Sequence, residues 1–163
     1  MNDQTVILER LRTDHDKQRE LLDAILETTG DSEKREELFA QLTKELKSHA
    51  AAEEQAVYSE MLAEPDVTQE TRHSVAEHHE IDEMLNDLAA TDMSSGAWLQ
   101  KFKQFEDRYR HHISEEEDDH FPNFAEQISE QQDDEMVEVF DARKQAEKQA
   151  AEVTPEKAED AKE

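Results

Sequence analysis

Two pairs of residues in this sequence have side-chain types and a spacing that suit metal binding. His49 and Glu53, and again His112 and Glu116, are four positions apart in the chain. Residues four apart lie on one face of an α-helix, so each pair can direct an imidazole and a carboxylate to one point. Both pairs interrupt stretches that are otherwise apolar at helical spacing, and buried histidine or glutamate needs a partner. Two such pairs facing one core predict a site for two metal ions with carboxylates between them.

Two further histidines lie on apolar helical faces of their own. His15 has leucines before and after it at helical spacing, and His78 is in line with Val75, Ile81 and Leu85. A single histidine in such a place is usually a hydrogen-bonded core residue. Here, however, the number of residues between each of these positions and the nearest turn is almost the same on neighbouring helices. In an antiparallel bundle, both His–Glu pairs and both single histidines therefore lie at one height, within about 2–3 Å along the helix axes. The predicted metal ligands are therefore His15, His49, Glu53, His78, His112 and Glu116.

The helical register separates these histidines from the others in the chain. His79 and His111 adjoin two of the predicted ligands but share their faces with charged and amide side chains, so we expect them in solvent. His73 is also predicted to be exposed. For His120, one turn beyond Glu116, exposure is favoured over a place behind the ligands.

Long helices must position these residues. Helix-forming Glu, Lys, Gln and Ala dominate, with only two Gly and three Pro. The segments 28–32, 65–66 and 93–96 predict turns, and 121–123 predicts a break or a kink. The expected helices span residues 4–28, 33–62, 67–90 and 96–121, with a shorter one at about 129–148.

Short connections between long helices favour antiparallel neighbours. The fold prediction is therefore all-α: an up-down antiparallel four-helix bundle with a short fifth C-terminal helix. The bundle domain is assigned to residues 1–128, and residues 129–148 form a helix that packs on the bundle or extends from it. Residues 149–163 are interpreted as an acidic, disordered tail, and Tyr58, Tyr109 and Trp98 as core residues rather than redox partners.

Composition narrows the classes of function. Of 163 residues, 38% are charged and the formal net charge is −26, so nucleic acid and anionic membranes are disfavoured as partners. The lack of cysteine excludes disulfides, thiolate ligands and cysteine nucleophiles. Neither a signal peptide nor a membrane-spanning stretch is evident, so a cytoplasmic location is expected by elimination, for a monomer or a weak dimer.

Imidazole and carboxylate ligands suit iron, zinc and manganese, and iron fits best. Six protein ligands do not saturate two octahedral ions, which leaves positions for oxo, hydroxo or a small diatomic ligand. Ferritin-like sites instead use Glu-x-x-His steps with lone glutamates, so that interpretation ranks lower.

The stretches around these residues resemble the hemerythrin-like HHE cation-binding domain over residues 5–125. They read HAAAEE at 49–54, EHHEID at 77–82 and HHISEEEDDHFP at 111–122. The resemblance implies a four-helix bundle with a non-haem di-iron centre. Carried over residue by residue, it implies two oxo- or hydroxo-bridged iron ions, with manganese or zinc as substitutes, on the same six side chains.

The sequence departs from the oxygen-carrying hemerythrins at two positions. Those proteins place a second histidine one turn after the third-helix ligand, where this chain has Asp82, and their last ligand pair is His-x4-Asp rather than His112-x3-Glu116. We therefore expect binding of, or reaction with, oxygen, nitric oxide or peroxide in sensing, scavenging or iron handling. The alternatives are a di-iron redox enzyme acting on peroxide, nitric oxide or ferrous iron, and a reversible oxygen carrier.

Overall fold

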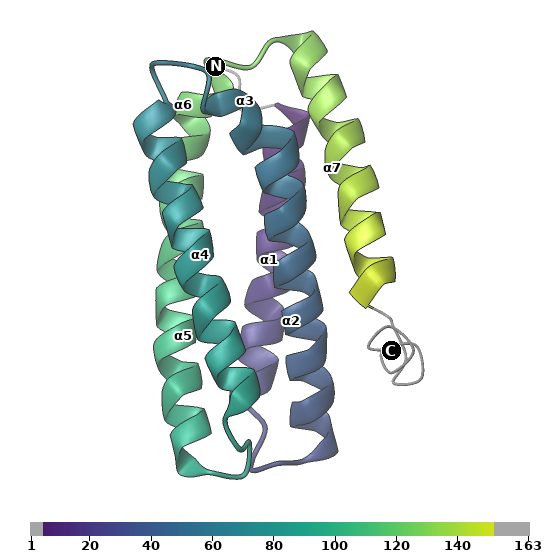
Figure 1. Ribbon diagram of the computed structural model, residues 1–163, viewed down its shortest axis with the longest axis vertical. Helices are drawn as coiled ribbons and strands as arrows, with labels where there is room; N and C mark the ends of the chain where they lie inside the picture. Colours follow the sequence, from purple (N-terminus) through teal and green to yellow (C-terminus); the bar gives the residue numbers. More distant parts are fainter. Residues whose placement is uncertain (1–4, 152–163) are drawn as a thin grey trace, which may run out of the picture.

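The computed structural model describes residues 5–151, and regular secondary structure within this range is exclusively helical. Four long helices run antiparallel to their neighbours in sequence (Figure 1). A further helix, α7, lies along the outside of this bundle. This arrangement confirms the predicted all-α bundle with a fifth helix. The prediction that the fifth helix is short is wrong, because α7 has 22 residues and the bundle helices have 20 to 23. The bundle helices are α1 (Val6–Leu26), α2 (Glu33–Glu53), α4 (Thr68–Ala90) and α5 (Gly96–Glu115), and the fifth helix is α7 (Glu130–Ala151).

Two of the long helices continue through a wide, π-helical turn. Helix α2 passes through η1 (Glu54–Tyr58) into α3 (Ser59–Met61), and α5 passes through η2 (Glu116–His120) into α6 (Phe121–Ala125). Of the predicted break or kink at 121–123, the break is therefore wrong, because the helix continues to Ala125. Pro122 lies in the first turn of α6, where the wide turn has already displaced the usual helical hydrogen bonds, so its missing N–H costs little.

Side-chain acceptors cap the starts of helices, among them α1 and α2. The Ser32 hydroxyl accepts a hydrogen bond of 3.2 Å from the Arg35 N–H at the start of α2. Helix α1 is capped from a distant part of the chain. The Asp133 carboxylate on α7 accepts from the N–H groups of Val6 (2.9 Å) and Ile7 (2.8 Å). A negative charge is favourable at this end of a helix, so α7 stabilises α1 directly.

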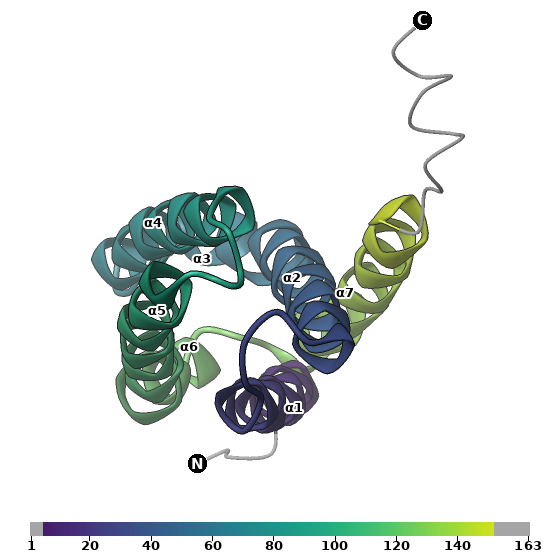
Figure 2. The same ribbon diagram turned by 90° about the horizontal axis from the view of Figure 1, so that it is seen from below.

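Figure 2 shows the bundle end-on, with α1, α2, α4 and α5 at four corners. The close contacts are within the hairpins, α1 with α2 and α4 with α5, whereas the two hairpins meet over fewer residues. Helix α7 packs outside the square against α1 and α2. It ends at Ala151, so the first three residues of the predicted tail are helical, and residues 152–163 lie outside the described range.

Buried apolar side chains form two separate cores, one at each end of the bundle, with a layer of buried polar residues between them. The lower core lies toward the α1–α2 and α4–α5 turns, at the bottom of Figure 1. Its members are Leu21, Leu22, Ile25, Leu38, Phe39, Leu42, Leu46, Ile81, Leu85, Leu88, Trp98, Phe102, Phe105, Tyr109 and Ile113. The upper core comprises Ile7, Leu8, Leu11, Ala52, Ala56, Val57, Tyr58, Met61, Val67, Phe121, Phe124, Met136 and Phe140.

One residue of the predicted apolar faces lies elsewhere. Val75 is 38% exposed, and the buried positions in this part of α4 are held by Thr71 and Ser74. The Ser74 hydroxyl bonds to the His120 ring, so a polar contact determines which residue faces inward here. Within residues 5–151, none of the helices combines the length and apolar character needed to cross a membrane.

Candidate metal centre

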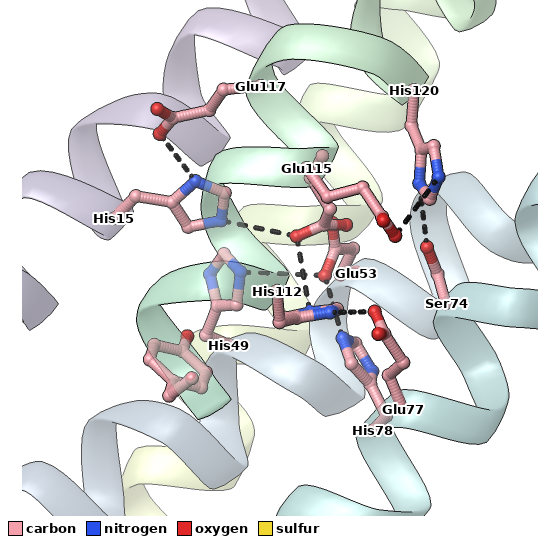
Figure 3. Close-up of polar contacts among 12 residues, drawn as sticks. His15, His49, Glu53, Ser74, Glu77, His78, His112, Glu115, Glu117 and His120 are labelled. Atoms are coloured by element: carbon pink, nitrogen blue, oxygen red, sulfur yellow. Dashed lines mark hydrogen bonds and ion pairs between the residues drawn. The ribbon is translucent and has the colours of Figure 1, made fainter. Parts of the chain in front are cut away.

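The structure brings all six predicted ligands together in the polar layer between the two cores (Figure 3). They come from four helices, and Glu116 is the first residue of η2. All six side chains are buried. The structure thus buries all six side chains, and their role as metal ligands stays a prediction: His15, His49, Glu53, His78, His112 and Glu116.

Each of the two glutamates lies between histidines from different helices. The Glu116 Oε1 atom is 3.4 Å from Nε2 of His15 and 3.4 Å from Nε2 of His112. The Glu53 Oε1 atom is 3.5 Å from Nε2 of His49 and 3.2 Å from Nε2 of His78. Four Nε2 atoms therefore point inward toward two carboxylates (Figure 3).

Several of these inward atoms are buried without a hydrogen bond from any described residue. They include Nε2 of His15 and His49, both carboxylate oxygens of Glu53, and Oε1 of Glu116. An unpaired buried polar group costs free energy, and an unpaired buried charge costs more. Metal ions would give these atoms the partners that they lack, because imidazole and carboxylate are ligands of the same class of cations. The residues present therefore fit a pair of metal ions.

The outer nitrogen of each of the four histidines donates to a second carboxylate. These bonds hold the ring orientation and leave Nε2 free to act as a ligand. The pairs are His15 Nδ1 with Glu117 (2.8 Å), His49 Nδ1 with Asp14 (2.9 Å), His78 Nδ1 with Glu54 (2.8 Å), and His112 Nδ1 with Glu77 (2.7 Å).

These four bonds form a closed ring around the bundle. Asp14 on α1 bonds to His49 on α2, and Glu54 on η1 bonds to His78 on α4. Glu77 on α4 bonds to His112 on α5, and Glu117 on η2 closes the ring by bonding to His15 on α1. Each outer carboxylate is the immediate sequence neighbour of a predicted ligand on its own helix. The sequence analysis did not assign a role to these four carboxylates. An acidic residue directly beside each predicted ligand pair or single histidine was the pattern that could have identified them.

Cations hold three of the ring carboxylates from the outside. Lys144 of α7 lies 2.6 Å from Asp14, and arginines lie 3.0 Å from Glu77 and 2.8 Å from Glu117. Burial raises the pKa of these three carboxyl groups, but the bonds from histidine and the nearby cation outweigh it and lower each pKa to about 2. The fourth, Glu54, is 46% exposed.

The same contacts shift the histidines in the opposite direction. Burial alone would lower the pKa of His49 and His78. The bond to Asp14 and the nearby carboxylate of Glu53 outweigh burial and raise the pKa of His49 to about 9, while the carboxylates of Glu53 and Glu54 raise that of His78 to about 10. Without metal, these two imidazoles therefore carry protons at neutral pH.

Tyr58 belongs to the centre as well as to the core. Its hydroxyl donates a 2.5 Å hydrogen bond to Glu116 Oε2 and lies 3.4 Å from His78 Nε2. Burial, with the charges of Glu116 and Glu53, raises the pKa of Tyr58 well above 10, so its hydroxyl stays protonated. Sequence reasoning placed Tyr58 in the core but missed this contact.

The remaining histidines test the register argument. The side chains of His79 and His111 are 78% and 70% exposed, and His73 is half-exposed, as predicted. The prediction for His120 is wrong, because this residue is buried. It lies one turn beyond the inward-facing Glu116, at the end of η2, and its ring contacts the Ser74 hydroxyl at 3.0 Å.

Residues 6–124 match the family model of the hemerythrin HHE cation binding domain. The chain belongs to this family. The HHE domain match covers all six predicted ligands, and the buried clusters of histidine, glutamate and aspartate fit the cation binding that the family description states.

Two similar proteins extend this result. The crystal structure of a hemerythrin HHE cation binding domain-containing protein from Mycobacterium kansasii superposes with a TM-score of 0.78 at 26% identity, covering 92% of this chain and 90% of that one. A protein from Nostoc sp. named "DNA nickase" is 29% identical over 147 residues. That match covers 88% of this chain but only 39% of the Nostoc protein, so this chain spans about two fifths of its relative's length.

Proposed function

We propose that this HHE domain holds two iron ions at its six inward-facing ligands and that the centre binds or reacts with a small oxidant. Oxygen, nitric oxide and peroxide are the candidate oxidants, in sensing, scavenging or iron handling. The observation that carries the proposal is the convergence of four Nε2 atoms on two carboxylates whose inward oxygens lack hydrogen bonds among the described residues.

Ligand chemistry supports iron. The site combines imidazole with carboxylate, a set that suits iron, manganese and zinc, and the sequence contains no cysteine to favour softer ions. Bound iron would supply electrons to the oxidant, which zinc cannot do. The protein's own part is to orient the histidines through the outer carboxylate ring and to keep bulk water out of the polar layer.

The space beside the centre suits a ligand of two or three atoms. A cavity of about 30 Å³ lies between α2 and α4, lined among others by His49, Ala50, His78 and Tyr109. This is about the volume that one water molecule occupies in the liquid. A wider hollow of about 370 Å³, lined by Ala51, Glu54 and His78, opens the same corner to solvent.

Two residues favour reaction over reversible carriage. Asp82 stands where the carriers have an extra histidine, and its carboxylate pairs with Lys47 at 3.1 Å instead of entering the centre. With four imidazoles rather than five, an oxygen adduct should be less persistent. Tyr58 holds a proton 2.5 Å from Glu116, where it could be donated to a reduced ligand.

Metal analysis and an absorption spectrum of the purified protein test the first part. We expect about two iron ions per chain, and their loss in His112→Ala or Glu53→Ala. The matched controls His111→Ala and His79→Ala should keep both ions, since these side chains are exposed. Equal loss from both members of a histidine doublet would contradict the ligand assignment.

Stopped-flow mixing of the reduced protein with oxygen tests the second part. One-way oxidation is expected, and an adduct that releases oxygen on degassing would instead indicate a carrier. Steady turnover of excess peroxide would identify the redox enzyme among the alternatives. Tyr58→Phe should slow the oxidation while the iron content stays at two, because only the proton near Glu116 is removed.

Nucleic acid is not part of this proposal. The name of the Nostoc relative describes a much longer protein, and a net charge of −26 opposes binding to the phosphate backbone.

A further inference from the structure

A second group of metal-binding side chains lies next to the centre, on the outer side of α4 and α5. The Glu115 Oε1 atom is 2.9 Å from Nε2 of His73 and 3.7 Å from Nε2 of His120. The Glu77 Oε2 atom is 3.2 Å from the same His73 nitrogen. None of these four residues is among the six ligands of the proposed di-iron centre.

This group shares one feature with the main centre: one nitrogen of a histidine ring is held by a polar group, and the other nitrogen faces a carboxylate. The Nδ1 atom of His120 is 3.0 Å from the Ser74 hydroxyl, which orients the ring and directs Nε2 toward Glu115 (Figure 3). The Glu115 Oε1 atom is buried and makes no hydrogen bond of acceptable geometry among the described residues. Two imidazole nitrogens thus face one carboxylate oxygen that needs a partner.

The spacing of the ligand atoms suits one ion. Metal–ligand bonds of about 2.0–2.1 Å at tetrahedral angles separate neighbouring ligand atoms by about 3.3 Å. The Glu115 Oε1 atom is 2.9 Å from Nε2 of His73 and 3.7 Å from Nε2 of His120, so the two separations lie on both sides of that value.

The surroundings are open and mostly acidic. The group lies in a hollow of about 900 Å³ whose lining also includes Glu70, Asp118 and Asp119. Arg72 is the basic residue of this lining, and Arg108 pairs with Glu77 at 3.0 Å. Because Arg108 already neutralises Glu77, the free ligands are His73, Glu115 and His120, with solvent able to complete the coordination.

We propose that His73, Glu115 and His120 form an accessory site for a divalent transition-metal ion, which delivers metal to the buried centre. Glu115 directly precedes the central ligand Glu116, and Glu77 accepts a 2.7 Å bond from the ring of His112. The accessory site is therefore linked to the centre through the chain at Glu115 and through Glu77, which contacts both His73 and His112. Metal binding at the accessory site goes beyond the proposed function, whereas the delivery role rests on the proposed metal centre.

Calorimetric titration of the iron-loaded protein with zinc tests the site. One zinc ion per chain should bind with micromolar affinity, while metal analysis shows that the original iron is retained. His73→Ala should weaken zinc binding at least tenfold, and because His73 is half-exposed its removal leaves the core intact. His120→Ala should have the same effect.

The matched control is His79→Ala, since His79 is also an exposed histidine paired with a glutamate one turn later, at 3.0 Å. It should bind zinc like the unaltered protein. Equal weakening in His79→Ala, or no stoichiometric binding at all, would overturn the accessory site. Failure of the di-iron proposal would appear separately, as a wrong iron content or as no reaction with oxidant.

The rate of ferrous iron uptake by the metal-free protein tests the delivery role. His73→Ala should slow loading several-fold and reach the same final content of two ions per chain. A rate equal to that of His79→Ala would exclude delivery through this site.

Discussion

The lower and upper cores of the bundle differ in how they are built. The lower core comes entirely from α1, α2, α4 and α5, and its residues follow helical spacing without interruption. The upper core also needs residues from η1, α3, α6 and α7. Apolar periodicity therefore describes one end of the molecule well, whereas the other depends on wide turns and on a helix added from outside.

The metal centre lies where these two kinds of structure meet. Glu53 is the last residue of α2 before η1, and Glu116 is the first residue of η2. π-Helical turns are rare and frequently occur at functional sites. Both central glutamates of this protein thus adjoin a change of helical pitch, which separates the regular core from the irregular one.

The largest expected effect concerns the polar layer between the cores, in metal-free protein at high pH. The folded-state pKa values of His49 and His78, about 9 and about 10, lie above the ordinary value of 6.5. Their contribution to stability is therefore complete below pH 6.5 and is lost as the pH rises through 9 to 10. Breaking a buried ion pair costs about 3–5 kcal/mol, so denaturation curves at pH 7 and pH 10.5 should differ strongly.

Metal-loaded protein is the control for this experiment, because its ligand imidazoles are already neutral. Its stability should change much less between the two pH values. Equal losses with and without metal would mean that the polar layer is not responsible.

Substitution of one large aromatic residue in each core sharpens the comparison. Phe102 stacks on Trp98 in the lower core, and Phe121 stacks on the His15 ring at 5.9 Å in the upper core. Each change to alanine should cost about 3–5 kcal/mol in chemical denaturation. Only Phe121→Ala should also weaken metal binding, by about tenfold or more, since it removes the support of a ligand. Equal metal affinity in the two variants would show that the cores do not differ in this way.

A smaller effect is expected at the contact that joins α7 to the upper core. Asp133→Ala should lower stability by about 1–3 kcal/mol, because two N–H groups of α1 lose their acceptor. The control Asp134→Ala changes an exposed acid in the same turn and should stay within about 0.5 kcal/mol. If both variants denature alike, α7 does not cap α1.

The smallest effect is expected from salt, and it should act on the whole molecule. Residues 145–163 carry six acids and three lysines, which leaves an excess of −23 on the rest of the chain. Between 0.1 and 1 M salt the Debye length falls from about 10 Å to about 3 Å, so mutual repulsion weakens and the melting temperature should rise. A melting temperature that does not change with salt would indicate local pairing of the acids instead.

The regular parts of the molecule could be predicted from the sequence. Apolar residues at steps of three and four gave the four long helices, and equal distances from the turns brought six ligand-type residues to one height. The same register separated the inward His78 and His112 from the exposed His79 and His111. These predictions need only a constant rotation of about 100° per residue.

Where the rotation changes, prediction from the sequence was less accurate. At η2, the favoured prediction missed that His120 is buried and that the helix continues through Pro122. Contacts between distant segments, such as Asp133 with the start of α1 and Tyr58 with Glu116, have no local pattern that announces them. The outer carboxylates do have a local pattern, an acid next to a predicted ligand. The histidine that each acid contacts can be assigned only when the order of the helices around the bundle is known.

The closed ring of carboxylate–histidine bonds has a consequence for the order of folding. Two of its bonds, Asp14 with His49 and Glu77 with His112, lie within a hairpin, and the other two cross from one hairpin to the other. Each hairpin can therefore orient only one of its histidines before the two associate. Local contacts form fastest, so the hairpins should arise first as half-sites, and their docking completes the set of ligands. Metal capture should then coincide with the last step of folding and lock the two halves of the bundle together.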